Sequence, residues 1–244
     1  MRMPKPAWVL VLLSLVVKGP APAQAQAPAP NLDSVPASES KEAAALIDRA
    51  ATALAGGKGP ADILTDPAFM DAHQWTRFRK LIATYSTGSR TAIVTPSEPG
   101  PPLHVTGSVK KADGSPLAGA LVYVYQTSSE GWYSAKAPHI SGMGGDTDHA
   151  RLFGYMTSDA RGEFEFRTIH PKGYPGSDLP AHIHIQVTPA GGSHATLVSE
   201  ILFDDDPRLT PPVAERSRRE GFRICHVHVA EDGGLKVRAE FTVP

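Results

Sequence analysis

The chain has 244 residues, of which 41% are hydrophobic and 20% charged, and its formal net charge at pH 7 is −1. This length allows one sizeable domain with an accessory segment, or two small domains. The charges are nearly balanced and form no long run of one sign, so the sequence gives no support for nucleic-acid binding. The single cysteine, Cys225, excludes an internal disulfide. The fold therefore depends on packing, with or without a metal ion.

The N-terminus has the three parts of a secretory signal peptide. Arg2 and Lys5 make a basic start, residues 8–17 are apolar, and small residues follow up to Ala27. The apolar run is too short to span a bilayer, which takes about 20 residues. We therefore predict a signal peptide over residues 1–25 and export to the periplasm or the extracellular space, with no integral membrane span in the mature chain. A retained anchor helix is the alternative.

Residues 26–100 are predicted to be a linker followed by a short helical segment. The Pro-rich stretch at residues 28–36 is expected to be a flexible start of the mature chain. Apolar side chains then recur at helical spacing over residues 42–54, and the stretch at residues 56–60, with its glycines and proline, ends that helix.

A second helix is predicted to begin at Asp66-Pro67, because Asp caps helix N-termini and Pro suits the first helical position. Its apolar stripe ends at Tyr85, and Gly88 is suited to close it. The stripes of both helices are expected to pack on the main domain or on a partner subunit. A homo-oligomer formed through the N-terminal helices is therefore an assembly that the sequence allows.

Residues 101–244 show the pattern of a mainly β domain. The stretches that read as strands are residues 103–109, 119–126, 162–168, 181–188 and 195–203. Asp113-Gly114 and Gly233-Gly234 mark turns, the second of which joins the two final strands. Many short strands without interleaved helices predict a β-sandwich or barrel, preceded here by the short helical N-terminal segment.

Two histidines lie on one of these strands, in the sequence Ala-His-Ile-His-Ile-Gln-Val. Because side chains alternate between faces along a strand, His182, His184 and Gln186 point to one side while the intervening Ile and Val residues point to the other. One face can cover a core, and the opposite face offers two neighbouring imidazoles. Tyr133 and Tyr174 lie upstream in Glu-Gly-Trp-Tyr and Lys-Gly-Tyr-Pro. Two histidines with two tyrosines form an uncommon ligand set, which points to ferric iron.

In this order, the motifs resemble those of the intradiol ring-cleavage dioxygenases, the family of the catechol and protocatechuate dioxygenases. The resemblance rests on Gly131-Trp-Tyr133, on Tyr174-Pro175 and on His182-Ile-His184. It covers about residues 103–244 and includes the segments 107–109, 113–126, 157–175 and 197–203. It implies a β-sandwich catalytic domain and a role in the breakdown of aromatic compounds.

The resemblance also implies a cofactor, a ligand set and a reaction. Tyr133, Tyr174, His182 and His184 would bind non-haem Fe(III), with a solvent hydroxide as a fifth ligand. A small aromatic diol would bind through both oxygens, displacing the hydroxide and Tyr174, and the displaced groups would accept its protons. Reaction with O2 would then cleave the ring between the two hydroxyl-bearing carbons, with the metal as Lewis acid and template. Taken singly, each of these residues is more often a surface or packing residue.

Two positions depart from the family's pattern. Leu179 stands where the family usually has Arg, three residues before the first histidine, and Glu200 stands where it often has Gln. We count both as candidate catalytic positions, together with Tyr174. In the family, an Arg at the position of Leu179 can stabilise negative charge on the bound ring. One cation is lost and one carboxylate gained, so the departures favour an altered substrate or slow turnover.

Two alternatives to an enzyme of this kind stay open. One is a non-catalytic or altered-activity β-sandwich binding protein that retains a metal site, and the other is a zinc hydrolase that uses the histidine pair. Tyrosine is an unusual zinc ligand, since zinc commonly takes Cys, His and carboxylate. The second pair, His226 and His228, is expected to have a surface or packing role. The group of His139, Asp146, Asp148 and His149 lies in or beside a Gly-rich segment that is expected to be a solvated loop at the site entrance.

Overall fold

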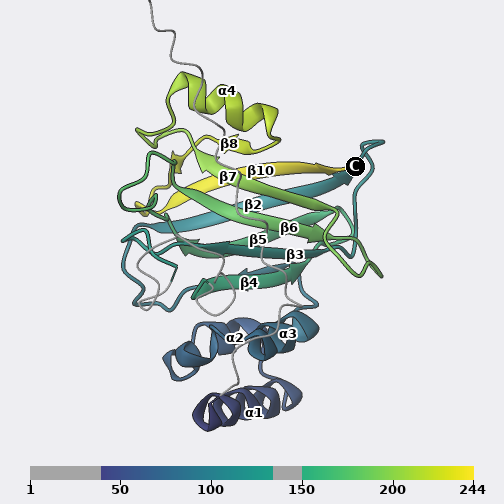
Figure 1. Cartoon of the computed structure of the whole chain (residues 1–244). Coiled ribbons are helices and arrows are strands. Elements are labelled where there is room, and N and C mark those ends of the chain that lie inside the picture. Colours follow the sequence, from purple (N-terminus) through teal and green to yellow (C-terminus); the bar gives the residue numbers. More distant parts are fainter. Residues whose placement is uncertain (1–39, 134–149) are drawn as a thin grey trace, which may run out of the picture.

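The structure is a computed structural model that describes residues 40–133 and 150–244. Two five-stranded sheets pack face to face, and the N-terminal helices lie against one side of the sandwich (Figure 1). The predicted signal peptide, the linker at residues 28–36 and the Gly-rich segment with His139 and His149 lie outside the described residues. Among the helices that are described, none has the length and apolar character needed to cross a membrane.

The first predicted helix is confirmed as α1, Lys41–Ala55. The Ser40 side chain caps its N-terminus by accepting a hydrogen bond from the Ala43 amide, and Gly56 is the C-cap. Its buried positions, Ala43, Ile47, Ala50 and Leu54, follow the predicted helical stripe. The stretch that ends α1 also begins a further short helix, α2, Pro60–Leu64.

The second predicted helix is wrong as a single element. Asp66 does cap a helix, since its carboxylate accepts from the Ala68 amide at 2.9 Å, but the helix that it caps is a short 3₁₀ helix, η1, Pro67–Ala72. The α-helix proper, α3, begins after a break and covers Thr76–Tyr85, with Ser86 rather than Gly88 as its C-cap. The break has a physical reason, because it lets the buried His73 side chain turn toward the sheet and donate a hydrogen bond from Nδ1 to a backbone carbonyl there, at 2.7 Å.

Both sheets of the predicted sandwich are present. The first sheet has the order β1-β5-β2-β10-β9, with β1 at Arg90–Ala92, β2 at Pro102–Lys111, β5 at Glu163–Ile169, β9 at His228–Val229 and β10 at Leu235–Val243. The second has the order β4-β3-β6-β7-β8, with β3 at Leu121–Gln126, β4 at Leu152–Thr157, β6 at His182–Thr188, β7 at Leu197–Phe203 and β8 at Arg223–Cys225. A further helix, α4 at Pro211–Arg219, lies beside β8 (Figure 1).

The five predicted strands correspond to β2, β3, β5, β6 and β7, and the Gly233-Gly234 turn joins β9 to β10 as predicted. Strand β1 pairs with β5 ahead of residue 101, so the sheet also takes in residues from the stretch expected to be linker and helix. Strand β4 was not predicted because its sequence shows no alternation and Gly154 interrupts its short apolar run.

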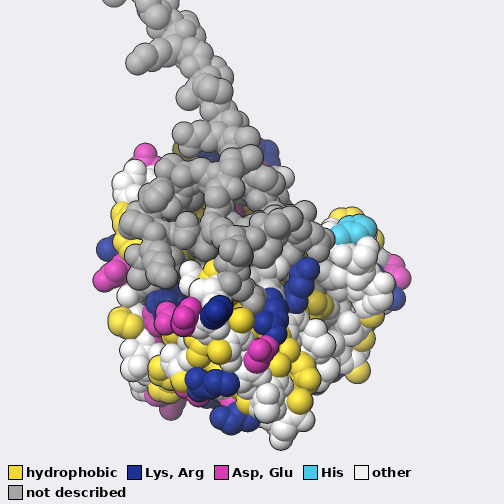
Figure 2. Space-filling view, turned by 60° about the horizontal axis from the view of Figure 1, so that its bottom comes forward, with side chains coloured by type: hydrophobic (Ala, Val, Ile, Leu, Met, Phe, Trp, Pro, Cys, Tyr) yellow, Lys and Arg dark blue, Asp and Glu magenta, His cyan; other side chains and the backbone are white. Residues whose placement is uncertain are grey.

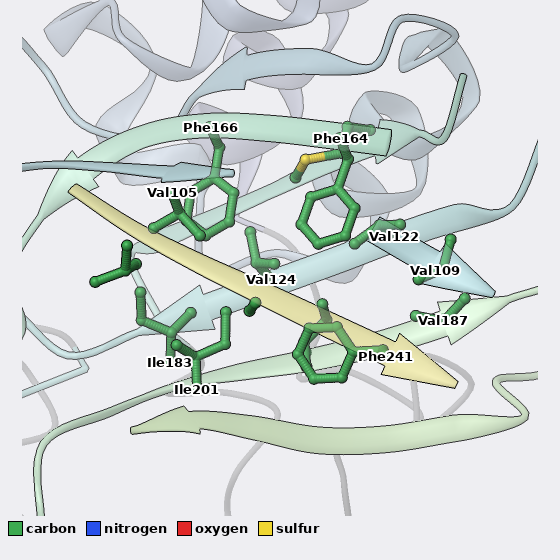
Figure 3. Packing of buried hydrophobic residues seen from close by; sticks show 14 of the residues in the cluster. Val105, Val109, Val122, Val124, Phe164, Phe166, Ile183, Val187, Ile201 and Phe241 are labelled. Carbon is green, nitrogen blue, oxygen red and sulfur yellow. The ribbon is translucent and has the colours of Figure 1, made fainter. Parts of the chain in front are cut away.

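The core of the sandwich is formed by the inward faces of the two sheets. Val105 and Phe166 from the first sheet meet Val124, Ile183 and Ile201 from the second, and all are fully buried (Figure 3). On β6, the predicted alternation holds, since the residues between and after the histidines belong to this core. The histidines therefore lie on the outer face of the second sheet.

That outer face is divided between the helices and the polar side chains of β6. Helices α1 to α3 cover its β4 and β3 side, where their apolar residues form a second cluster with Tyr123, Phe153 and Tyr155. The apolar stripes thus pack on the main domain, which was one of the two predicted partners. An oligomer formed through these helices stays a prediction. On the solvent side of this region, basic, acidic and apolar side chains are interspersed (Figure 2).

Candidate metal centre

Four side chains of the predicted ligand set meet at one point on the outer face of the second sheet. The Tyr133 hydroxyl lies 2.5 Å from the Tyr174 hydroxyl and 2.7 Å from Nε2 of His184. The Tyr174 hydroxyl lies 2.9 Å from Nε2 of His182, and the two Nε2 atoms lie 3.1 Å apart. Two donors at about 2.1 Å from a metal ion, at a right angle to each other, would be about 3 Å apart. The cluster therefore has the dimensions of one coordination sphere.

The other ring nitrogen of each histidine has its own acceptor. Nδ1 of His182 donates to the Pro180 carbonyl at 2.8 Å, and Nδ1 of His184 lies 3.5 Å from a carboxylate oxygen of Glu200. Such acceptors fix which nitrogen carries the proton and leave Nε2 as the electron-pair donor. Both rings are thus oriented for binding a metal through Nε2.

A third contact holds the His184 ring. Tyr125 on β3 is directly opposite His184 on β6, and the two rings stack with centroids 4.4 Å apart and planes 15° apart. Glu200 on β7 is opposite His184 on its other side. Sequence reasoning missed the role of Tyr125, because its position beside His184 depends on strand pairing that a single sequence does not specify.

The glycine of the Gly-Trp-Tyr motif is required by a close backbone approach. Gly131 has a φ of 87°, and a Cβ atom there would lie 2.6 Å from the Gly173 carbonyl oxygen. Only glycine adopts this conformation readily and leaves room for that oxygen. The contact brings together the two loops that carry Tyr133 and Tyr174, two residues from the first glycine and one from the second.

The electrostatics of the site favour a bound cation. Desolvation raises the pKa of Tyr133 well above its usual value, and the neighbouring Tyr174 raises it further. Desolvation also raises the pKa of Tyr174, and the charge of Glu200 adds to the rise. Both phenols are therefore neutral at neutral pH unless a strong Lewis acid displaces their protons. A ferric ion fits this set of donors, because tyrosinate oxygen and imidazole nitrogen suit it and two tyrosinates compensate much of its charge.

The two positions that depart from the family's pattern have different surroundings. Glu200 is buried, and its carboxylate lies beside Nδ1 of His184, the ring nitrogen on the side away from the donor cluster. Leu179 is 42% exposed, so the loop before β6 presents an apolar side chain where a guanidinium was expected. A guanidinium does approach this position from elsewhere, since Nη1 of Arg208, on the connection after β7, lies 3.4 Å from the Leu179 carbonyl oxygen.

The second histidine pair forms a different arrangement. The rings of His226 and His228 are 4.4 Å apart, and His226 donates from Nδ1 to the Asp204 carboxylate at 2.5 Å. Both histidines are exposed. Within the described ranges, the one group of three His, Cys, Asp or Glu side chains close enough to share an ion is His182, His184 and Glu200. The expectation of a surface role for the second pair agrees with this geometry.

Comparison with known proteins places these residues in a family. The family model described as "Dioxygenase" matches residues 78–241. Catechol 1,2-dioxygenase 1 of Acinetobacter lwoffii is 30% identical over 154 residues, which are 57% of this chain and 47% of that protein. Hydroxyquinol 1,2-dioxygenase of Rhizobium sp. (strain MTP-10005) is 32% identical over 126 residues, which are 45% of this chain and 40% of that protein. The chain thus aligns with less than half the length of these two curated relatives.

Solved structures give similar matches. The dioxygenase domain of a dioxygenase carbohydrate-binding protein fusion from Streptomyces sp. SirexAA-E is 27% identical, with a TM-score of 0.47 over 65% of this chain and 88% of that one. Catechol 1,2-dioxygenase from Pseudomonas arvilla C-1 is 23% identical, with a TM-score of 0.49 over 64% of this chain and 56% of that one.

Proposed function

Because the chain belongs to the intradiol ring-cleavage dioxygenase family, we propose that it is an iron(III)-dependent dioxygenase that opens a catechol-type ring between its two hydroxyl-bearing carbons. The observation that carries the proposal is a ring of two phenol oxygens and two imidazole nitrogens, in which each atom lies 2.5–3.1 Å from its two neighbours. These are the donors that would hold the iron. Its substrates would be a small aromatic diol and O2.

The chain's own residues have separable tasks in this reaction. When bound, ferric iron acts as a Lewis acid that draws electron density from the diol ring and makes the ring reactive toward O2. Tyr174 lies in the loop before β6 rather than on a strand, so its phenol can move away without disturbing the sheet. A displaced tyrosinate is a base, so the Tyr174 oxygen could then accept a proton from the diol. His182 and His184 would stay in place, because both lie on β6, which is paired with β7, and Tyr125 stacks on the His184 ring. The Tyr133 ring also contacts Tyr125, with centroids 6.0 Å apart.

Oxygen uptake by the iron-loaded protein tests the proposal. With an active diol from a panel of catechols, we expect one O2 to be consumed per diol and both atoms of ¹⁸O2 to appear in a ring-opened dicarboxylic acid. The resting protein should be reddish, because tyrosinate bound to ferric iron absorbs visible light. Coloured protein that consumes no O2 with any diol of the panel would contradict the enzymatic function.

A second candidate function is favoured by one observation. Leu179 and Glu200 remove a cation from the site and add a buried carboxylate, which is the change expected of a binding protein that kept the metal site but lost turnover. The enzyme, the binding protein and the zinc hydrolase differ in the expected colour of the protein and in its uptake of O2. A coloured protein that binds catechol tightly without using O2 indicates the binding protein, whereas colourless protein that holds zinc indicates the hydrolase.

We also propose that the protein is exported. The support is the sequence of residues 1–25, in which a basic start, a short apolar run and small residues follow one another as in a secretory signal peptide. Expression of the full chain in a bacterial host should give a mature form outside the cytoplasm. Its N-terminus, read by mass spectrometry, should lie near residue 26. An intact Met1 on cytoplasmic protein would contradict export.

A further inference from the structure

A backbone hydrogen bond links the proposed ligand Tyr133 to the side of the sheet that the helices cover. The Arg151 amide donates to the Tyr133 carbonyl oxygen at 2.7 Å. Arg151 immediately precedes β4, the strand against which α3 packs. Whatever holds Arg151 therefore also holds the backbone of Tyr133.

Arg151 is held by its side chain and by its carbonyl group. Its guanidinium makes a two-pronged contact with the Glu98 carboxylate, with both N–O distances at 2.6 Å, and the Glu98 side chain is only 5% exposed. Bidentate pairs of this kind fix orientation as well as position. The Arg151 carbonyl accepts the hydrogen bond from Nδ1 of His73, at 2.7 Å.

The side chains of His73 and Arg79, which donate hydrogen bonds from the helical side, are buried. His73 is fully buried and stacks on Phe78. Burial lowers its pKa to about 4, against the opposing effect of its hydrogen bond to the Arg151 carbonyl. It is therefore neutral at physiological pH, with its one proton on Nδ1. The Arg79 guanidinium, 2% exposed, donates to the Tyr123 hydroxyl at 2.9 Å and also to the carbonyl of Ala150.

We propose that Arg151, held by Glu98 and His73, is a positioning residue for Tyr133, so that residues between η1 and β2 help to place a ligand of the iron site. This inference rests on the proposed function, and it adds a role for residues that supply no ligand. His73 lies before residue 78, where the match to the family model begins. The sequence resemblance did not indicate it, because that resemblance covers about residues 103–244.

Glu98→Gln tests the inference, because it keeps the shape of the side chain and removes the charge that pairs with Arg151. In the iron-loaded protein we expect the tyrosinate-to-iron band to shift and the release of iron to a chelator to be about tenfold faster, the lower end of the effect of losing an outer partner of a metal site. Glu215→Gln is the matched control, since Glu215 pairs with Arg219 at the same distance of 2.6 Å on the exposed face of α4.

Hydrogen exchange in the metal-free protein measures the same link without iron. The Arg151 amide should exchange about tenfold faster in Glu98→Gln than in the wild type. If the wild type binds no iron, the proposed function fails, but the exchange measurement still tests the link. An unchanged band with unchanged release, or unchanged exchange where no iron is bound, overturns the inference. If Glu98→Gln does not fold, Arg151→Lys, which keeps the charge but not the two-pronged contact, is measured by the same criteria.

Discussion

Tyr133→Phe and His184→Ala are each expected to lose most of the bound iron and the visible band. The first removes an anionic oxygen donor and the second a nitrogen donor from a cluster in which neighbouring donor atoms lie 2.5–3.1 Å apart. Loss of a partner outside the ligand set typically costs about 10–100-fold in metal affinity, so loss of a ligand should cost more than about a hundredfold. Iron content per protein and the visible spectrum after gel filtration measure the effect.

His228→Ala is the control for that result. It removes an imidazole from a second His-x-His sequence, but His228 is exposed and meets the His226 ring edge to face, and Nδ1 of His226 donates to Asp204. Iron content and colour should equal those of the wild type. If His228→Ala loses as much iron as His184→Ala, the ligands have been assigned to the wrong histidine pair.

The strands predicted from the sequence are those in which apolar residues alternate with polar ones or form an uninterrupted run. In β6, the histidines and isoleucines alternate, and the structure buries the isoleucines between the sheets. The sequence misled us where tertiary contacts decide the conformation. The break between η1 and α3 places His73 against Arg151, and nothing in the local apolar spacing indicates it. Strand β8, Arg223–Cys225, is only three residues long and exists because it pairs with β7.

The candidate site was predictable to the extent that it depends on residue type and order. Tyr133, Tyr174, His182 and His184 were named from their motifs, and the structure brings them together. Its supporting contacts were not predictable, because they join residues from distant segments. Tyr125 reaches His184 by strand pairing, and Glu98 reaches Arg151 across 53 positions of sequence. Residue identity thus indicated the ligands, while register and packing determine how they are held.

Uncharged catechols are expected to be preferred over carboxylated ones such as protocatechuate. Glu200 places a buried negative charge 3.5 Å from Nδ1 of His184, and its charge raises the pKa of both Tyr133 and Tyr174. Leu179 supplies no charge to offset it. A carboxylated diol would therefore be repelled, whereas the neutral ring of catechol would not carry this additional charge into the site.

Glu200→Gln should raise kcat/KM for protocatechuate about tenfold relative to catechol, because two like charges about 10 Å apart repel by about 1.7 kcal/mol at an effective dielectric constant of about 20. The ratio of the two substrates is the useful quantity, since any change in how His184 is held affects both alike. Glu240→Gln is the control, because Glu240 pairs with Lys110 on the first sheet at 3.2 Å. A wild-type preference for protocatechuate that Glu200→Gln leaves unchanged would show that a cation offsets Glu200. Arg208, 3.4 Å from the Leu179 carbonyl, is then the first residue to replace.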